Sequence, residues 1–174
     1  MTEISVFRIS TIRRGRHEKV KLTMHSFGWF SEPPRLPDLP DLEIAQHGSP
    51  YEKSSLAERE NLSREAFAIL ADTTNIDIIT SLAMNYTTPA DILDRIAKSH
   101  PELHAFAATN PSASPELMKT APLSEHISSS IEEFLNHMNA TDDEARALVK
   151  RLHKLRPPGG PLLGEVWTQI RGES

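Results

Sequence analysis

Two similar stretches decide the fold: LAMNYTTPADIL at residues 82–93 and AATNPSASPELM at residues 107–118. Each contains small or apolar residues, then Asn, a turn rich in Ser and Thr, Pro, an acidic residue and two large apolar residues. The two Asn residues, Asn85 and Asn110, are 25 positions apart. A recurrence at this spacing predicts a solenoid, in which each repeat buries its apolar face only against the next repeat.

Weaker copies extend the pattern on both sides. One begins at Asn61, 24 positions before Asn85, and a degenerate copy surrounds Asn139, 29 positions after Asn110. The fold class that follows is mostly α, with a short-helix α-solenoid over residues 61–155.

Hydroxyl side chains precede most of the expected helices in this region. A Ser or Thr at the N-cap accepts a hydrogen bond from a backbone N–H of the first helical turn. The residues expected in this role are Ser63, Thr88, Ser99, Ser114 and Thr141. Glu144, three residues after Thr141, predicts a capping box.

The segments Asn85 to Leu93 and Asn110 to Met118 resemble the variant leucine-rich repeat, a helical solenoid family. In that family, short helices alternate around a turn similar to Asn-Pro-x-x-Pro, and Asn110-Pro111 is the nearest match to it. HEAT-like helical pairs are the alternative. The resemblance implies a binding scaffold. Some family members carry a cysteine-ligated iron–sulfur cluster, but this chain has 0 Cys, so no such cluster and no other cofactor is expected.

Residues 1–60 predict a basic β-hairpin followed by an extended, Pro-rich arm. The segments 4–12 and 20–24 are rich in β-branched residues or alternate between apolar and polar residues, as β-strands do. Residues 33–40 contain four Pro and favour the polyproline II conformation. Phe27, Trp29 and Phe30 lie between these parts and either anchor an interface or cover an end of the helical region.

The first 25 residues carry six basic side chains against two acidic ones. Their net charge is +4, so the rest of the chain carries −9 of the total of −5. Three interpretations remain open: binding to phosphates, a solvated strand face, or docking on an acidic protein surface, including that of a neighbouring copy. The candidate partner-binding residues here are Arg8, Arg13, Arg14, Arg16, Lys19 and Lys21.

Residues 156–174 predict a linker that contains Pro and Gly, followed by a short amphipathic helix. This helix either caps the solenoid or binds a partner. In the second case Trp167 is a candidate partner contact.

No pattern of catalytic or metal-binding residues is visible. His100 and His104 are four residues apart, but Pro101 stands where a metalloprotease motif needs Glu. No apolar run approaches the roughly 18 residues that cross a bilayer, and no secretory signal begins the chain.

We therefore expect a non-enzymatic protein–protein interaction module, without catalytic, metal or membrane sites. The arm-plus-module design suits a structural or accessory component of a larger assembly, such as a phage capsid or connector protein. Its partners would be proteins, including copies of itself or an assembly lattice, in the cytoplasm or in a virion. The alternative is an adaptor or regulator whose residues 1–25 bind nucleic acid.

Overall fold

The computed structural model describes residues 40–172, which are mostly helical. In chain order, the α-helices are α1 (Asp41–His47), α2 (Pro50–Ala57), α3 (Arg64–Ala71), α4 (Ile76–Met84), α5 (Ala90–Ser99), α6 (His104–Thr109), α7 (Pro115–Met118), α8 (Ser128–His137), α9 (Asp142–Leu152) and α10 (Leu163–Gly172). Two 3-10 helices, η1 (Pro101–Leu103) and η2 (Leu123–Glu125), lie between them. The mostly α class is confirmed, whereas the predicted β-hairpin lies outside the described residues.

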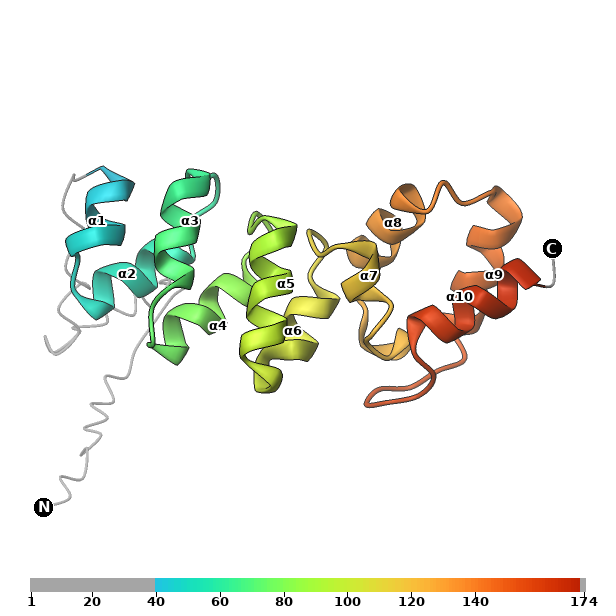
Figure 1. Ribbon diagram of the computed structural model, residues 1–174. Coiled ribbons are helices and arrows are strands. Elements are labelled where there is room, and N and C mark those ends of the chain that lie inside the picture. The colour runs from blue at the N-terminus through green and yellow to red at the C-terminus, as the bar shows by residue number, and fades with distance from the viewer. Residues whose placement is uncertain (1–39, 173–174) are drawn as a thin grey trace, which may run out of the picture. The chain divides into compact units, whose positions relative to one another are not determined.

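Successive helices of the first half alternate between two layers. Helices α1, α3 and α5 pack side by side in one layer, and α2, α4 and α6 pack side by side in the other (Figure 1). This is the arrangement of a helical solenoid, in which each pair of helices contacts the next pair.

Buried apolar side chains hold these short helices together. One cluster joins α1 to α5 and includes Ile44, Phe67 and Leu82. A second cluster continues from α5 to α10 and includes Leu93 and Phe134. Helices of this length are unstable alone in water, so their stability comes from burying these faces against their neighbours.

The helical part begins earlier than the sequence analysis places it. Helices α1 and α2 fall inside the segment 1–60 assigned to the arm, and they bury Ile44 and Leu56 against the repeats. Ser49 accepts a hydrogen bond from the Glu52 N–H at 3.3 Å and starts α2 with a capping box. The arm boundary at residue 60 is therefore corrected to about residue 40.

Three of the five predicted N-caps are confirmed. The Ser63 side chain accepts a hydrogen bond from the Ala66 N–H, and the Ser114 side chain accepts one from the Leu117 N–H, both at 3.1 Å. Thr141 and Glu144 form the predicted capping box, with the Thr141 N–H donating to Glu144 Oε2 at 2.7 Å.

Two predicted N-caps are wrong. Helix α5 begins after Pro89, and the Thr88 hydroxyl instead donates to the Leu82 carbonyl of α4 at 2.7 Å. Ser99 is the last residue of α5 and not the start of the next helix. Because Thr88 is fully buried, its hydroxyl satisfies a carbonyl at the end of the helix behind it.

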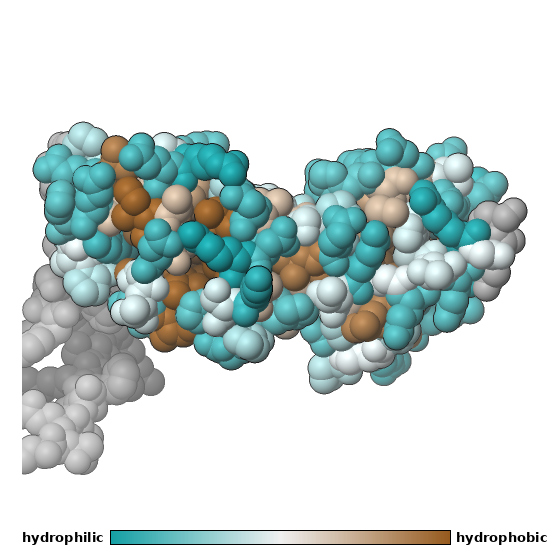
Figure 2. All heavy atoms as spheres, in the orientation of Figure 1, coloured by the Kyte–Doolittle hydropathy of each residue, from teal (hydrophilic) through white to brown (hydrophobic). Residues whose placement is uncertain are grey.

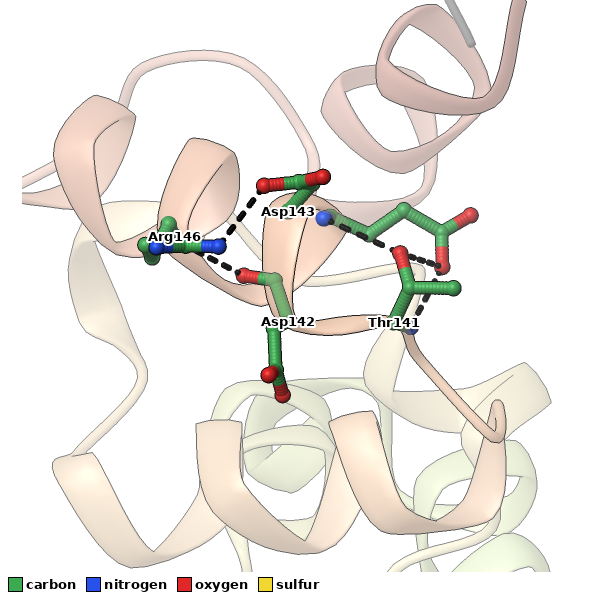
Figure 3. Close-up of polar contacts among 5 residues, drawn as sticks. Thr141, Asp142, Asp143 and Arg146 are labelled. Carbon is green, nitrogen blue, oxygen red and sulfur yellow. Dashed lines mark hydrogen bonds and ion pairs between the residues drawn. The ribbon is translucent and has the colours of Figure 1, made fainter.

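The start of α9 shows how local polar contacts hold one helix end (Figure 3). Besides the Thr141 capping box, Arg146 donates to the Asp143 carboxylate at 2.8 Å and to the Asp142 carbonyl at 3.1 Å. The hydrogen bond from the Thr141 N–H lowers the pKa of Glu144, which keeps its carboxylate ionised at the positive helix end.

Helix α10 packs into the second cluster and covers its end. Trp167 is 3% exposed, and its ring meets Phe134 edge-on with centroids 5.3 Å apart. The Arg171 guanidinium carbon lies over the Trp167 ring, 4.8 Å from the ring centroid. The interpretation of this segment as a capping helix fits these contacts. Trp167 is a core residue, which corrects its assignment as a partner contact.

His126 links α7 to α8 inside this second cluster. Its Nδ1 lies 2.9 Å from Ser130 Oγ, and its Nε2 lies 3.1 Å from the Met118 carbonyl oxygen. Burial lowers the pKa of His126, and this effect outweighs the opposing contributions of the Met118 carbonyl and Glu125. The folded protein therefore holds this imidazole neutral at neutral pH.

Acidification should destabilise the protein through His126. Its pKa is about 6.5 in the unfolded chain and lower in the folded protein, so the unfolded state takes up the proton first. The free energy of unfolding should therefore be highest above about pH 6.5 and should fall as the pH drops toward the folded pKa. Urea denaturation across this range measures the effect. In a His126→Gln variant, the free energy of unfolding should fall less steeply as the pH drops. Equal pH dependence in the variant and the wild type would contradict the role given to His126.

Candidate protein-binding surface

A buried Asn side chain ties each of two consecutive repeats to the one before it. Asn85, at the end of α4, donates from Nδ2 to the Ala57 carbonyl at 2.9 Å and to the Arg59 carbonyl at 2.8 Å. Its Oδ1 accepts a hydrogen bond from the Thr87 N–H at 2.9 Å. The amide therefore closes its own turn and also satisfies two carbonyls of the preceding repeat.

Asn110 repeats this arrangement at the end of α6. Its Nδ2 donates to the Ala83 and Asn85 carbonyls at 2.9 and 3.0 Å, and its Oδ1 accepts from the Ser112 N–H at 2.9 Å. The Ser112 hydroxyl also donates to the Tyr86 carbonyl. The two amides form a ladder that holds the turn after α4 against the turn after α6.

The other two predicted copies do not continue this ladder. Asn61 and Asn139 are exposed and adopt left-handed φ values of 62° and 48°, which Asn tolerates better than most residues. In the first repeat, the Arg59 carbonyl occupies the place that the Asn85 carbonyl has in the next repeat. The four-copy periodicity is therefore corrected to two bonded copies within the described residues.

Apolar side chains are exposed beside this ladder. Because the Asn85 side chain points inward, its neighbours Met84 and Tyr86 are 56% and 58% exposed. Phe106 on α6 and Ile127 before α8 are 47% and 42% exposed. We call these four side chains the repeat patch.

Two adjoining hollows flank Met84 and Tyr86. One, of about 110 Å³, lies between them and Phe106 and Ile127. The other, of about 360 Å³, is also lined by Met84 and Tyr86 and is bordered by Glu58 and Glu60. The smaller hollow is well below the roughly 300 Å³ of typical small-molecule sites and suits a single side chain.

The described residues have a mainly hydrophilic exterior that apolar surface interrupts in several separate places, as the face in Figure 2 shows. Isolated apolar residues are normal on a protein surface, whereas adjoining ones mark interaction sites. The repeat patch belongs to the second kind, because Met84 and Tyr86 line both hollows.

The charge at one edge of the patch is negative. Among residues 40–172, neither Glu58 nor Glu60 forms an ion pair, while the intervening Arg59 pairs with Asp41 at 2.8 Å. The surrounding segment 41–138 contains 15 acidic and 6 basic residues. The patch therefore joins an apolar centre to an acidic border.

The structure describes only one of the sequence-based candidate residues. Nine of them, namely Arg8, Arg13, Arg14, Arg16, Lys19, Lys21, Phe27, Trp29 and Phe30, lie outside the described residues. Trp167 is buried in the second cluster instead.

The two histidines with helical spacing make separate contacts. His100 lies 3.4 Å from the Glu102 carboxylate, and His104 Nε2 lies 3.0 Å from Thr120 Oγ1. Within the part of the chain that the structure describes, no three His, Asp or Glu side chains gather in a metal-binding arrangement. No described helix has the length and apolar character needed to cross a bilayer.

None of the four residues of the repeat patch was predicted from the sequence. One signal was available for Met84 and Tyr86: where the backbone is extended, as at Asn85, neighbouring side chains point to opposite sides of the chain. Phe106 and Ile127 carried no comparable signal, because apolar residues in short helices are usually buried.

Asn110→Asp should destabilise the protein by about 3 kcal/mol, because it removes both donors and places a carboxylate against two buried carbonyl oxygens. Urea denaturation at neutral pH measures the change. The matched control is Asn139→Asp, an exposed position where the same substitution should change stability by less than about 0.5 kcal/mol. Similar losses in both variants would contradict the role of the ladder.

Comparison with known proteins gives one match. Residues 79–121 match the model of the Leucine Rich Repeat Variant domain. The matched segment contains both Asn85 and Asn110 and thus both steps of the ladder. No curated protein and no solved structure matches the chain significantly. Residues 79–121 are therefore similar to a leucine-rich repeat variant domain, the family that the repeat around Asn85 and Asn110 suggested.

Proposed function

We propose that this protein is a non-enzymatic protein-binding module and that a partner protein contacts the repeat patch. The observation that carries the proposal is the exposure of Met84, Tyr86, Phe106 and Ile127 around two adjoining hollows. Aromatic and Met side chains are enriched at protein interfaces, and a few such residues supply most of the binding energy.

The rigidity of the patch supports the same function. The backbone of Tyr86 is held by the Ser112 hydroxyl, and the turn beside it is held by the Asn85 amide. A surface that is ordered before binding loses less conformational entropy when a partner arrives. The match to a repeat family suggests a protein-interaction role independently of these contacts.

The wider role that we propose is that of a structural or accessory component of a larger assembly. Stacked repeats present several adjoining surfaces, which suits a protein that contacts more than one neighbour. A phage virion is one such setting, and the cytoplasm is the proposed location for a chain that is not phage-encoded.

The nucleic-acid alternative depends on residues 1–25, which lie outside the described residues. A capture experiment separates it from protein binding. The full chain and residues 36–174 are compared as bait in nuclease-treated and untreated lysates, because residues 36–174 retain α1 and α2. Capture of the same protein by both baits after nuclease treatment supports a protein-binding surface within residues 36–174, the part that contains the repeat patch. Capture that requires residues 1–35 and intact nucleic acid supports the alternative.

The double substitution Tyr86→Ser with Phe106→Ser should weaken partner binding about tenfold or more, because it removes two exposed aromatic contacts. Binding is measured by titration against the protein identified by capture. Tyr51→Ser is the matched control, since Tyr51 is 51% exposed and lines neither hollow. All variants should unfold at the same urea concentration as the wild type. If the double variant binds the partner as tightly as the wild type does, the interface lies elsewhere.

A further inference from the structure

A second exposed surface, on α9, has the opposite charge to the border of the repeat patch. The segment 145–156, with the sequence ARALVKRLHKLR, contains five Lys or Arg residues and no acidic residue. Lys150 and Lys154 are exposed and have no ion-pair partner among residues 40–172. These two lysines therefore present positive charge that no carboxylate of the described residues neutralises, whereas Arg146 pairs with Asp143.

The same surface has an apolar centre. Val149 is 36% exposed, and together with Ala145 it separates two hollows of about 300 and 410 Å³. Arg146, Lys150 and His153 border the larger one. We call the surface formed by these five residues, together with the exposed Lys154 four positions after Lys150, the α9 edge.

The repeat patch and the α9 edge carry opposite charges. Each has an apolar centre beside two hollows: Met84 and Tyr86 line both hollows of the patch, and Ala145 and Val149 line both hollows of the edge. Glu58 and Glu60 border one hollow of the patch. Arg146 and Lys150 border the larger hollow of the edge, while Glu132 borders the smaller one. Opposite charges around apolar centres are the arrangement that directs two surfaces into contact.

The geometry points to self-association: the repeat patch of one copy binds the α9 edge of a second copy. This inference rests on the proposed function, and it identifies the partner as another molecule of this chain. Because the two surfaces differ, the contact is head-to-tail and leaves one free patch and one free edge at the ends of each pair. Such a contact closes into a ring or continues as a filament.

Both surfaces are small compared with the roughly 800 Å² per partner of stable interfaces, so the affinity should be low. Much of the attraction is between exposed charges, which salt screens over about 10 Å at 0.1 M. The association should therefore grow with protein concentration and weaken as salt is raised.

Sedimentation velocity of the purified, nuclease-treated full chain tests the self-association directly. The wild type should form larger species at about 0.05 M salt and should revert toward the monomer at about 0.5 M salt. A wild type that stays monomeric at every concentration overturns the self-association but leaves binding to a different protein open. Larger species that vanish on nuclease treatment also overturn it, because nucleic acid would then bridge the basic segments.

Charge reversal identifies the two surfaces. The first variant carries Glu58→Lys with Glu60→Lys, and the second carries Lys150→Glu with Lys154→Glu. Each variant opposes like charges across the contact, so each alone should associate about tenfold more weakly than the wild type. An equimolar mixture of the two should associate again, because each patch then meets an edge of opposite charge.

The matched control is Glu43→Lys with Glu65→Lys, which changes the net charge as much as the first variant at exposed positions outside both surfaces. This control should associate like the wild type. The contact is refuted if the control loses association as much as the two charge-reversal variants do. It is also refuted if the mixture remains monomeric although both variants show the helical circular dichroism of the wild type.

Discussion

The hydrogen bonds from the Asn85 and Asn110 amides to carbonyls of the preceding repeat are the interaction on which the repeat structure depends. A buried carbonyl without a donor costs about 1–3 kcal/mol, so each amide prevents a loss comparable with a large part of a small protein's stability. The α-helices contain only 4 to 11 residues and gain little stability alone. The amides therefore determine the register in which these short helices stack.

The same interaction positions the surface that we propose for binding. An Asn side chain that turns inward leaves Met84 and Tyr86 on the outside, and the bond from Ser112 holds the Tyr86 carbonyl in place. Stability and function are thus connected through one turn. A change in the ladder would move the patch even where no patch residue is altered.

The errors of the sequence analysis have a common physical origin. Asn61 and Asn139 match the spacing of the ladder, but a left-handed turn uses Asn equally well and needs no contact with another repeat. Thr88 has the local features of an N-cap, yet its burial directs the hydroxyl to the Leu82 carbonyl. Trp167 has the amphipathic spacing of a partner contact, and Phe134, 33 positions earlier, provides the surface that buries it.

The sequence by itself determined the helical class, the repeat around Asn85 and Asn110, and the caps at Ser63, Ser114 and Thr141. Those features depend on residues a few positions apart, whose interactions are the same in any helix or turn. Only the tertiary structure decided where the solenoid begins, which apolar residues remain exposed, and how the charged surfaces are distributed. These properties depend on contacts between repeats about 25 residues apart, and the local pattern of residues does not specify such contacts.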